Sequence, residues 1–319
     1  MSGKTILLAE RGFSPEAAAI LSRAGTVVEF GSKRNFLHHL PAADVVMTAL
    51  DIEWDKSLLD RAFRLSLIGS RTTQLRYIDL KECRRRRIKI LNIHAGSSVL
   101  KNTPSTAEET MALILSLVRK IPWAFEWTKQ GKWGRNEFAG IELAGKKIGL
   151  VGFGRLGRMV ARYSRAFSMI PVAFDPRVGA EEMRRHRVRK VGLESLLKAS
   201  DIVSVHAVYD ASTRNLLGLR HFKMMKPSAW FINTARGEIT DEHALLLALK
   251  RHWIAGAAVD TLSNERPDGR HLIGHPLVDY SRRHENLIIV PHLGGSTREA
   301  VVRTQIHLSR IVAREIRKR

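Results

Sequence analysis

The feature that most constrains the fold is a glycine-rich turn between a short apolar strand and a helix. Residues 147–157 read Lys-Ile-Gly-Leu-Val-Gly-Phe-Gly-Arg-Leu-Gly, so Gly152, Gly154 and Gly157 form the pattern G-x-G-x-x-G. The first glycine allows a tight turn, the second lets a pyrophosphate approach the backbone, and the third lets the helix pack against the strand. A second apolar strand ends in Asp175, whose carboxylate can bind the ribose hydroxyls. The stretch predicts a dinucleotide-binding unit rather than a glycine-rich turn without a ligand.

Length and composition favour two domains in a reducing compartment. A chain of 319 residues exceeds the size at which one hydrophobic core usually stops growing, and 44% of its residues are hydrophobic. The single cysteine, Cys83, excludes an intrachain disulfide. The first residues read as a strand rather than as a signal peptide, and no apolar run approaches the roughly 20 residues of a membrane span. We therefore expect a soluble cytoplasmic protein.

The net charge of +22 suggests an anionic partner, such as nucleic acid or a membrane surface. The basic clusters are scattered along the chain, at residues 84–89, 184–190, 282–284 and 317–319. No aromatic residues interleave with them, and no nucleic-acid-binding motif accompanies them. We interpret these clusters as a solvated cationic surface and expect no nucleic acid or membrane partner.

Alternating apolar strands and helices predict two parallel sheets. Five strands are expected in the first hundred residues, at 5–9, 26–30, 45–48, 67–70 and 90–92. Six more are expected at 148–151, 172–174, 202–205, 230–233, 257–259 and 287–290. The last helix, over 299–317, is expected to return to the first domain. The chain is thus predicted to be α/β, with two doubly wound parallel-sheet domains. A Rossmann cofactor domain (99–291) is inserted into a flavodoxin-like substrate domain (1–98 and 292–319).

An aromatic segment interrupts this alternation between residues 123 and 138. It contains Trp123, Phe125, Trp127, Trp133 and Phe138. Large aromatic side chains are enriched in the cores of protein interfaces. The segment predicts a subunit interface, with a flap folded on its own chain as the alternative.

Three charged or titratable side chains follow three successive strands of the second series. Arg236, Glu265 and His292 come after its fourth, fifth and sixth predicted strands. Ligands of open α/β sheets bind at the carboxyl ends of the strands, so we expect the three side chains at one edge.

This set suits the reduction of a 2-oxo acid. Arg236 can hold the substrate carboxylate through two hydrogen bonds and polarise the carbonyl oxygen. His292 can donate a proton to that oxygen while a hydride reaches the carbon, and Glu265 can orient the imidazole and favour its protonated form. Taken singly, each has a structural explanation: a surface ion pair, a solvated acid or a core histidine. Together with the glycine turn they favour catalysis.

Further stretches carry a family resemblance, namely residues 140–147, 201–206, 213–217, 226–238, 257–260 and 291–297. With them, the chain resembles the D-isomer-specific 2-hydroxyacid dehydrogenase family over essentially its whole length. The resemblance is weakest in the N-terminal part. It is greatest to the catalytic cores of members that act on phosphoglycerate or on glyoxylate and hydroxypyruvate, without a regulatory tail.

The resemblance implies NAD as cofactor, hydride transfer at the 2-carbon of a small D-2-hydroxy or 2-oxo acid, a homodimer and no metal. It assigns catalysis to Arg236, Glu265 and His292. It assigns cofactor contacts to Thr106, Gly152, Gly154, Arg155, Leu156, Gly157, Asp175, His206, Thr213, Thr234, Ala235, Asp260 and Gly294. The alternative is a non-catalytic NAD(H)-sensing binding protein on the same scaffold that could bind nucleic acid through its basic surface. A pure sensor need not retain an acid–base pair.

One departure from the family concerns the substrate. The family carries a G-x-G-x-D loop whose backbone N–H groups bind the substrate carboxylate. The matching residues 71–76 read Arg-Thr-Thr-Gln-Leu-Arg, without either glycine or the acid. We predict that Arg71, Thr72, Thr73 and Gln74 line the substrate pocket. Arg71 would favour a substrate with a second anionic or polar group; the alternative is that Arg71 points to solvent.

A second departure is minor. The family commonly has a proline two residues after the histidine at position 206, where this chain has Val208.

Overall fold

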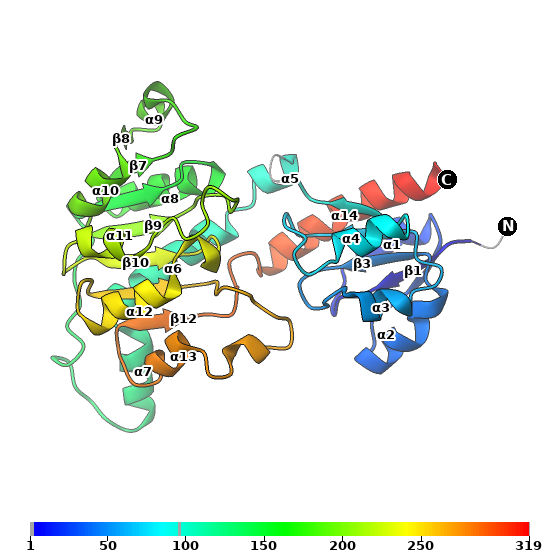
Figure 1. Ribbon diagram of the computed structural model, residues 1–319, viewed down its shortest axis with the longest axis horizontal. Helices are drawn as coiled ribbons and strands as arrows, with labels where there is room; N and C mark the ends of the chain where they lie inside the picture. Colours follow the sequence, from blue (N-terminus) through cyan, green and yellow to red (C-terminus); the bar gives the residue numbers. More distant parts are fainter. Residues whose placement is uncertain (1–2, 95–96, 319) are drawn as a thin grey trace. The chain divides into compact units, whose positions relative to one another are not determined.

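The structure is a computed structural model that describes residues 3–94 and 97–318 and is drawn in Figure 1. The chain divides into two compact units. Unit 1 comprises Met1–Thr103, Arg266–Arg270 and Thr297–Arg319, and unit 2 comprises Pro104–Glu265 and His271–Ser296. The predicted boundaries lie a few residues before the main ones observed, and the prediction did not separate 266–270. The last helix returns to unit 1, as predicted.

Unit 1 holds a five-stranded parallel sheet in the order β2-β1-β3-β4-β5, which is the flavodoxin-like order. Its strands are β1 (Thr5–Leu8), β2 (Thr26–Val28), β3 (Val45–Thr48), β4 (Leu67–Ser70) and β5 (Lys89–Asn92). Its helices are α1 (Pro15–Ser22), α2 (Lys33–His39), α3 (Lys56–Asp60), α4 (Leu80–Arg85), α5 (Ser98–Lys101) and α14 (Arg298–Arg317). The short 3-10 helix η1 (Leu40–Ala42) follows α2.

Both faces of this sheet are covered, since every residue of its central strands β3 and β4 is buried. Successive side chains of a strand point to opposite faces. Val46 joins a buried cluster around Trp54, whereas Val45 and Met47 join a second cluster with Val312 of α14. Gly69 of β4 permits this packing, since a Cβ there would lie 2.9 Å from both Met47 Sδ and Val312 Cγ2. The C-terminal helix is thus part of the core of unit 1.

Unit 2 holds a seven-stranded parallel sheet in the order β12-β11-β10-β9-β6-β7-β8. Its strands are β6 (Lys147–Val151), β7 (Ile170–Phe174), β8 (Arg189–Lys190), β9 (Ile202–Val205), β10 (Trp230–Asn233), β11 (Gly256–Val259) and β12 (Leu287–Ile289). The prediction of six strands was wrong, because β8 adds an edge strand in which Arg189 pairs with Val172 of β7.

Helices pack on both faces of the larger sheet, in two buried clusters. The helices of unit 2 are α6 (Ser105–Val118), α7 (Ile121–Lys129), α8 (Arg155–Ala166), α9 (Ala180–Arg185), α10 (Leu193–Ala199), α11 (Leu219–Met224), α12 (Glu242–Lys250) and α13 (Pro276–Ser281), with the 3-10 helix η2 (Gly237–Ile239). The 3-10 helix η3 (Arg270–Leu272) begins at the last residue of a unit 1 segment. Along α6, Ala107, Met111, Ile114 and Leu117 recur at helical spacing and belong to one buried cluster with Ile232 of β10 and Ala258 of β11. All seven strands run parallel, so the loops after β6, β9, β10, β11 and β12 leave the same edge of the sheet.

Within the described part of the chain, no helix is long and apolar enough to cross a membrane.

Candidate active site

The glycine turn after β6 has one open position and two crowded ones. Gly152 has a φ of 100°, and a Cβ there would lie 2.5 Å from Ala207 N. A Cβ on Gly157 would lie 2.4 Å from Gly152 O, so α8 packs directly on the turn. A Cβ on Gly154, at the start of α8, would meet nothing within 4 Å. The turn therefore leaves its approach open at the helix N-terminus, where a phosphate is favoured.

The carboxylate after β7 is held at the edge of this turn. Asp175 Oδ2 accepts the Phe153 N–H and Asp175 Oδ1 accepts the Arg177 N–H, both at 2.8 Å. Each oxygen keeps lone pairs that can accept a ribose hydroxyl. The guanidinium of Arg177 is paired with Asp210 instead, at 2.9 Å. Hydrogen bonds from Ser212 and Arg177 lower the pKa of Asp210 to about 2. Arg177 is thus held by an ionised acid other than Asp175.

Two further predicted cofactor contacts belong to the segment after β9. His206 is buried, with Nε2 2.9 Å from Ser204 Oγ, and burial lowers its pKa to about 4, so it is neutral at pH 7. Thr213 closes its own loop, since its hydroxyl donates to Val208 O and accepts the Asp210 N–H, both at 2.8 Å. At the start of α8, burial lowers the pKa of the Arg155 guanidinium.

Asp260 anchors the loop that carries His292. Its side chain is 1% exposed, and its oxygens accept the Leu293 N–H at 2.5 Å and the Gly294 N–H at 3.0 Å. Its backbone carbonyl accepts the His292 N–H at 2.9 Å. Burial raises the pKa of Asp260, and the backbone N–H groups and nearby His292 act in the opposite direction. These bonds hold His292 in a left-handed conformation, with a φ of 54°, that is uncommon for a non-glycine residue.

His292 and Glu265 form a hydrogen-bonded pair. His292 Nδ1 lies 2.7 Å from Glu265 Oε2, and Glu265 Oε1 accepts the Leu262 N–H at 3.0 Å. Burial raises the pKa of Glu265, but the bonds from His292 and Leu262 and the charge of Arg236 outweigh it, so the pKa is lowered. Glu265 is therefore ionised at neutral pH, and its bond to Nδ1 leaves Nε2 for another partner.

Two acids outside the pair fix the loop that presents Glu265. Glu242 of α12 accepts the Ser263 N–H at 2.6 Å, and Glu238 accepts the Asn264 N–H at 3.2 Å. His275 Nε2 lies 3.3 Å from the other oxygen of Glu242. The sequence analysis did not identify Glu238 and Glu242 as residues that position this loop. A hydrogen bond between a loop N–H and an acid more than 20 residues away produces no recognisable sequence pattern.

Arg236 follows β10 in a turn organised by Asn233. The buried side chain of Asn233 accepts the Ala235 N–H at 3.0 Å and donates to Arg236 O at 2.8 Å. The half-buried Arg236 donates from Nη1 to Ala235 O at 2.6 Å. The sequence analysis did not identify Asn233 as a site residue either, although a polar residue at the end of an apolar strand can indicate a functional position.

The N-terminal turn of α6 connects two of these loops. Thr110 Oγ1 lies 2.8 Å from Thr234 Oγ1 in the loop after β10 and donates to Thr106 O at 2.7 Å. The hydroxyl of Thr106 donates to Gly294 O at 3.0 Å in the loop after β12. Unit 2 therefore brings together Arg236, Glu265, His292 and the predicted cofactor residues of the neighbouring loops.

The predicted substrate loop belongs to unit 1, where Arg71 forms an ion pair. Arg71 Nε donates to Glu10 Oε2 at 2.6 Å; the side chains of Arg71 and Glu10 are 23% and 4% exposed. Gln305 of α14 also donates to Glu10 Oε2, at 3.1 Å. Arg71 therefore does not point freely into solvent, and its charge is matched by a buried acid.

Side chains also form hydrogen bonds to backbone carbonyl groups of this loop. Thr72 Oγ1 donates to Gln74 O at 2.6 Å, and the Asn92 amide donates to Thr73 O at 3.3 Å. Thr73 is exposed, whereas Thr72 and Gln74 are half-buried. Their contact with substrate stays a prediction. Among the residues that the structure describes, no group of three or more His, Cys, Asp or Glu could hold a metal ion.

Comparison with known proteins identifies the family. The model of the D-isomer specific 2-hydroxyacid dehydrogenase, NAD binding domain, matches residues 111–294. D-3-phosphoglycerate dehydrogenase of Archaeoglobus fulgidus is 34% identical over 314 residues, which are 98% of this chain and 56% of that protein. The Bacillus subtilis enzyme of the same name is 36% identical over 261 residues, covering 82% and 46%. The chain thus spans about half the length of these curated relatives.

A solved structure agrees with the fold. D-lactate dehydrogenase of Aquifex aeolicus, complexed with NAD and lactic acid, superposes with a TM-score of 0.78 at 24% identity, over 99% of this chain and 96% of that one. The chain therefore belongs to the D-isomer-specific 2-hydroxyacid dehydrogenase family and carries its NAD-binding domain.

Proposed function

We propose that the protein is an NAD-dependent oxidoreductase that transfers a hydride between NAD(H) and the 2-carbon of a small D-2-hydroxy or 2-oxo acid. The observation that carries the proposal is the Glu265–His292 pair, 2.7 Å apart, in the same unit as Arg236 and the glycine turn. Reduction of a 2-oxo acid needs a proton donor beside a hydride source. At this edge of the sheet, His292 can donate the proton, and the glycine turn can bind the cofactor that carries the hydride.

The residues around the glycine turn fit a dinucleotide. The open position at Gly154 and the N-terminus of α8 suit its pyrophosphate, and the free lone pairs of Asp175 suit the adenosine ribose. NAD, when bound, supplies or accepts the hydride. The contacts proposed for the nicotinamide side come from Thr106, Thr234, Ala235, Asp260 and Gly294.

The proton is assigned to His292 Nε2. Because Glu265 holds Nδ1, Nε2 can give its proton to the substrate carbonyl oxygen during reduction and recover it from the hydroxyl during oxidation. Glu265 stabilises the imidazolium and fixes the orientation of the ring. Arg236 binds the substrate carboxylate through its guanidinium, which orients the 2-carbon and polarises its oxygen.

The substrate is proposed only as a class, a small 2-oxo or 2-hydroxy acid. The curated relatives are named for D-3-phosphoglycerate, an acid with a second anionic group. Arg71 in the loop of unit 1 is the residue proposed to respond to such a group.

An assay of NADH consumption with glyoxylate, hydroxypyruvate and pyruvate, and of NAD reduction with D-3-phosphoglycerate, tests the proposal. We expect turnover with at least one of them and formation of the D-isomer. Tight NADH binding without turnover of any 2-oxo or 2-hydroxy acid would instead favour a non-catalytic NAD(H) sensor, which none of the comparisons supports.

We also propose that the protein forms a homodimer and is located in the cytoplasm. The segment around α7 exposes Ile121 (53%), Phe125 (63%) and Trp133 (91%). Burying such side chains against a second copy would remove apolar surface from water. Light scattering on the purified protein tests the dimer, and Trp133→Lys should yield monomers. The cytoplasmic location rests on the single cysteine.

A further inference from the structure

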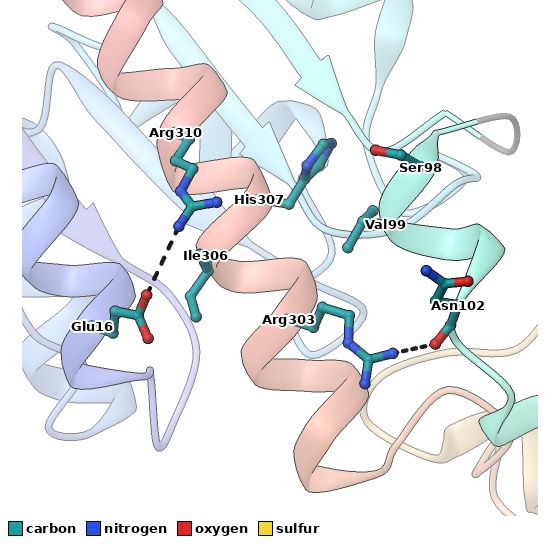
Figure 2. A pocket seen from close by; sticks show the side chains of 8 residues that line it. All are labelled: Glu16, Ser98, Val99, Asn102, Arg303, Ile306, His307 and Arg310. Atoms are coloured by element: carbon teal, nitrogen blue, oxygen red, sulfur yellow. Dashed lines mark hydrogen bonds and ion pairs between the residues drawn. The ribbon is translucent and has the colours of Figure 1, made fainter.

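A pocket of unit 1 is lined by none of the residues assigned above. It has a volume of about 620 Å³ and lies between α1, α5 and α14 (Figure 2). The residues that line it are Glu16, Ser98, Val99, Asn102, Arg303, Ile306, His307 and Arg310. Its size is typical of a small-molecule site, and its lining combines two guanidinium groups with an apolar middle.

The two arginines are at opposite ends of the pocket. Arg303 and Arg310 are seven residues apart on α14, which corresponds to about 10 Å along the helix axis. Figure 2 shows Arg310 beside Glu16 at one end and Arg303 beside Asn102 at the other, with Val99 and Ile306 between them. A ligand that spans the pocket would therefore meet a positive charge at each end and apolar side chains in the middle.

Neither arginine is neutralised by a strong ion pair. Arg310 Nη2 lies 3.9 Å from Glu16 Oε1, and both side chains are about 60% exposed, so the pair contributes little. Arg303 donates from Nη1 to the carbonyl of Asn102 and to Thr103 Oγ1. These neutral acceptors fix its guanidinium without cancelling the charge.

The ring of His307 lines the pocket, and Figure 2 shows it near Ser98. Among residues 3–94 and 97–318, no hydrogen-bond partner of this ring is found. Burial and the charge of Arg310 lower the pKa of His307, so the ring is neutral at pH 7. The pocket then has one net positive charge, and it has two when His307 is protonated.

We propose that this pocket binds a small organic acid with two anionic groups, phosphate or carboxylate, about 10 Å apart and joined by a less polar middle. One acidic group binds Arg303, the other binds Arg310 in place of Glu16, and the middle lies over Val99 and Ile306. The site is independent of the proposed active site, because every lining residue belongs to unit 1 and none is assigned to substrate or cofactor.

Calorimetric titration of the whole protein tests this, with a hexose bisphosphate and octanedioate as probes. NADH is present at saturation so that no probe enters the cofactor site. Arg310→Gln is compared with Arg314→Gln, the same substitution one turn further along α14 at an exposed position outside the pocket. We expect one probe to bind, Arg310→Gln to weaken it by about 10- to 100-fold, and Arg314→Gln to leave it unchanged.

The two probes also distinguish a phosphate site from a carboxylate site. The charged groups that line the pocket with His307 are Glu16 from α1 and Arg303 and Arg310 from α14. The lining residues of α5, Ser98 and Val99, are uncharged. Binding should therefore tighten as the pH falls and His307 gains a proton, and His307→Gln should abolish this gain. The proposal is overturned if neither probe binds, or if Arg310→Gln and Arg314→Gln weaken binding equally, since diffuse surface charge then explains it.

Discussion

Replacing Glu265 by glutamine isolates the contribution of the acid–base pair without changing the size of the side chain. The two carboxylate oxygens each accept one hydrogen bond, from Leu262 N–H and from His292 Nδ1. An amide has a single acceptor oxygen and cannot serve both donors. If the amide nitrogen faces the imidazole, it donates to Nδ1 and forces the proton onto Nε2. Either arrangement removes the negative charge that stabilises the imidazolium.

The expected loss follows from the strength of a hydrogen bond between charged groups, about 1.5–3 kcal/mol. Glu265 and His292 are 30% and 24% exposed, so solvent screening favours the lower part of that range. The kcat for reduction should then fall by about 10- to 100-fold. Because the pKa of Glu265 is lowered in the folded protein, its ionised form stabilises the fold at neutral pH. That stabilisation disappears as the pH falls through the lowered pKa, and the glutamine variant should lack this pH dependence.

Steady-state kinetics in both directions across pH check this prediction. We expect kcat to fall and the KM for NADH to stay near that of the wild type, since the substitution removes the carboxylate beside His292 and no predicted cofactor contact. Glu285→Gln, the same change at an exposed acid of unit 2, serves as the control. A folded Glu265→Gln protein with wild-type kcat at every pH would refute the reasoning.

Four further substitutions test other parts of the account. Gly154→Ala should keep the wild-type Tm but weaken NADH binding, because its Cβ meets nothing within 4 Å in the protein; Gly157→Ala should lose about 1–3 kcal/mol of stability, since its Cβ would lie 2.4 Å from a backbone oxygen. Asp175→Ala should reduce a preference for NADH over NADPH, measured as the ratio of kcat/KM values; a wild-type preference for NADPH would contradict the role of this acid. Arg71→Ala should lower kcat/KM by about 10- to 100-fold for a doubly anionic substrate and hardly change it for glyoxylate. It should also lower the Tm by removing the ion pair of buried Glu10, and equal kinetic effects on both substrates would reject the specificity role.

The predicted strands match the structure best where burial is complete. The strands expected at 45–48 and 67–70 have the observed bounds of β3 and β4, because a strand covered on both faces is a nearly continuous apolar run. The two-residue strand β8 was missed, since Arg189 and Lys190 have neither the length nor the apolar pattern of a strand. Charged residues are typical of an exposed sheet edge, and the sequence of an edge resembles that of a loop.

The candidate site was predictable as far as it depends on strand ends. The Glu265–His292 contact follows from two neighbouring parallel strands, each of which delivers one side chain to the same edge. The Glu10–Arg71 pair joins the loops after β1 and β4, and its formation depends on the order of the strands in the sheet. Hydrophobic periodicity reports only on residues within a few positions of each other, so it does not reveal such a pair.

The most direct test of the central claim is the kcat for NADH-dependent reduction of a 2-oxo acid by wild-type protein and by His292→Asn, with the NADH Kd measured for both. Asparagine is suitable because it tolerates the left-handed backbone that His292 adopts. If His292 is the proton donor, the wild type reduces at least one 2-oxo acid, and the variant loses about 10²- to 10⁴-fold in kcat with an unchanged Kd for NADH. Wild-type turnover in the variant, or NADH binding by the wild type without any turnover, would contradict the account.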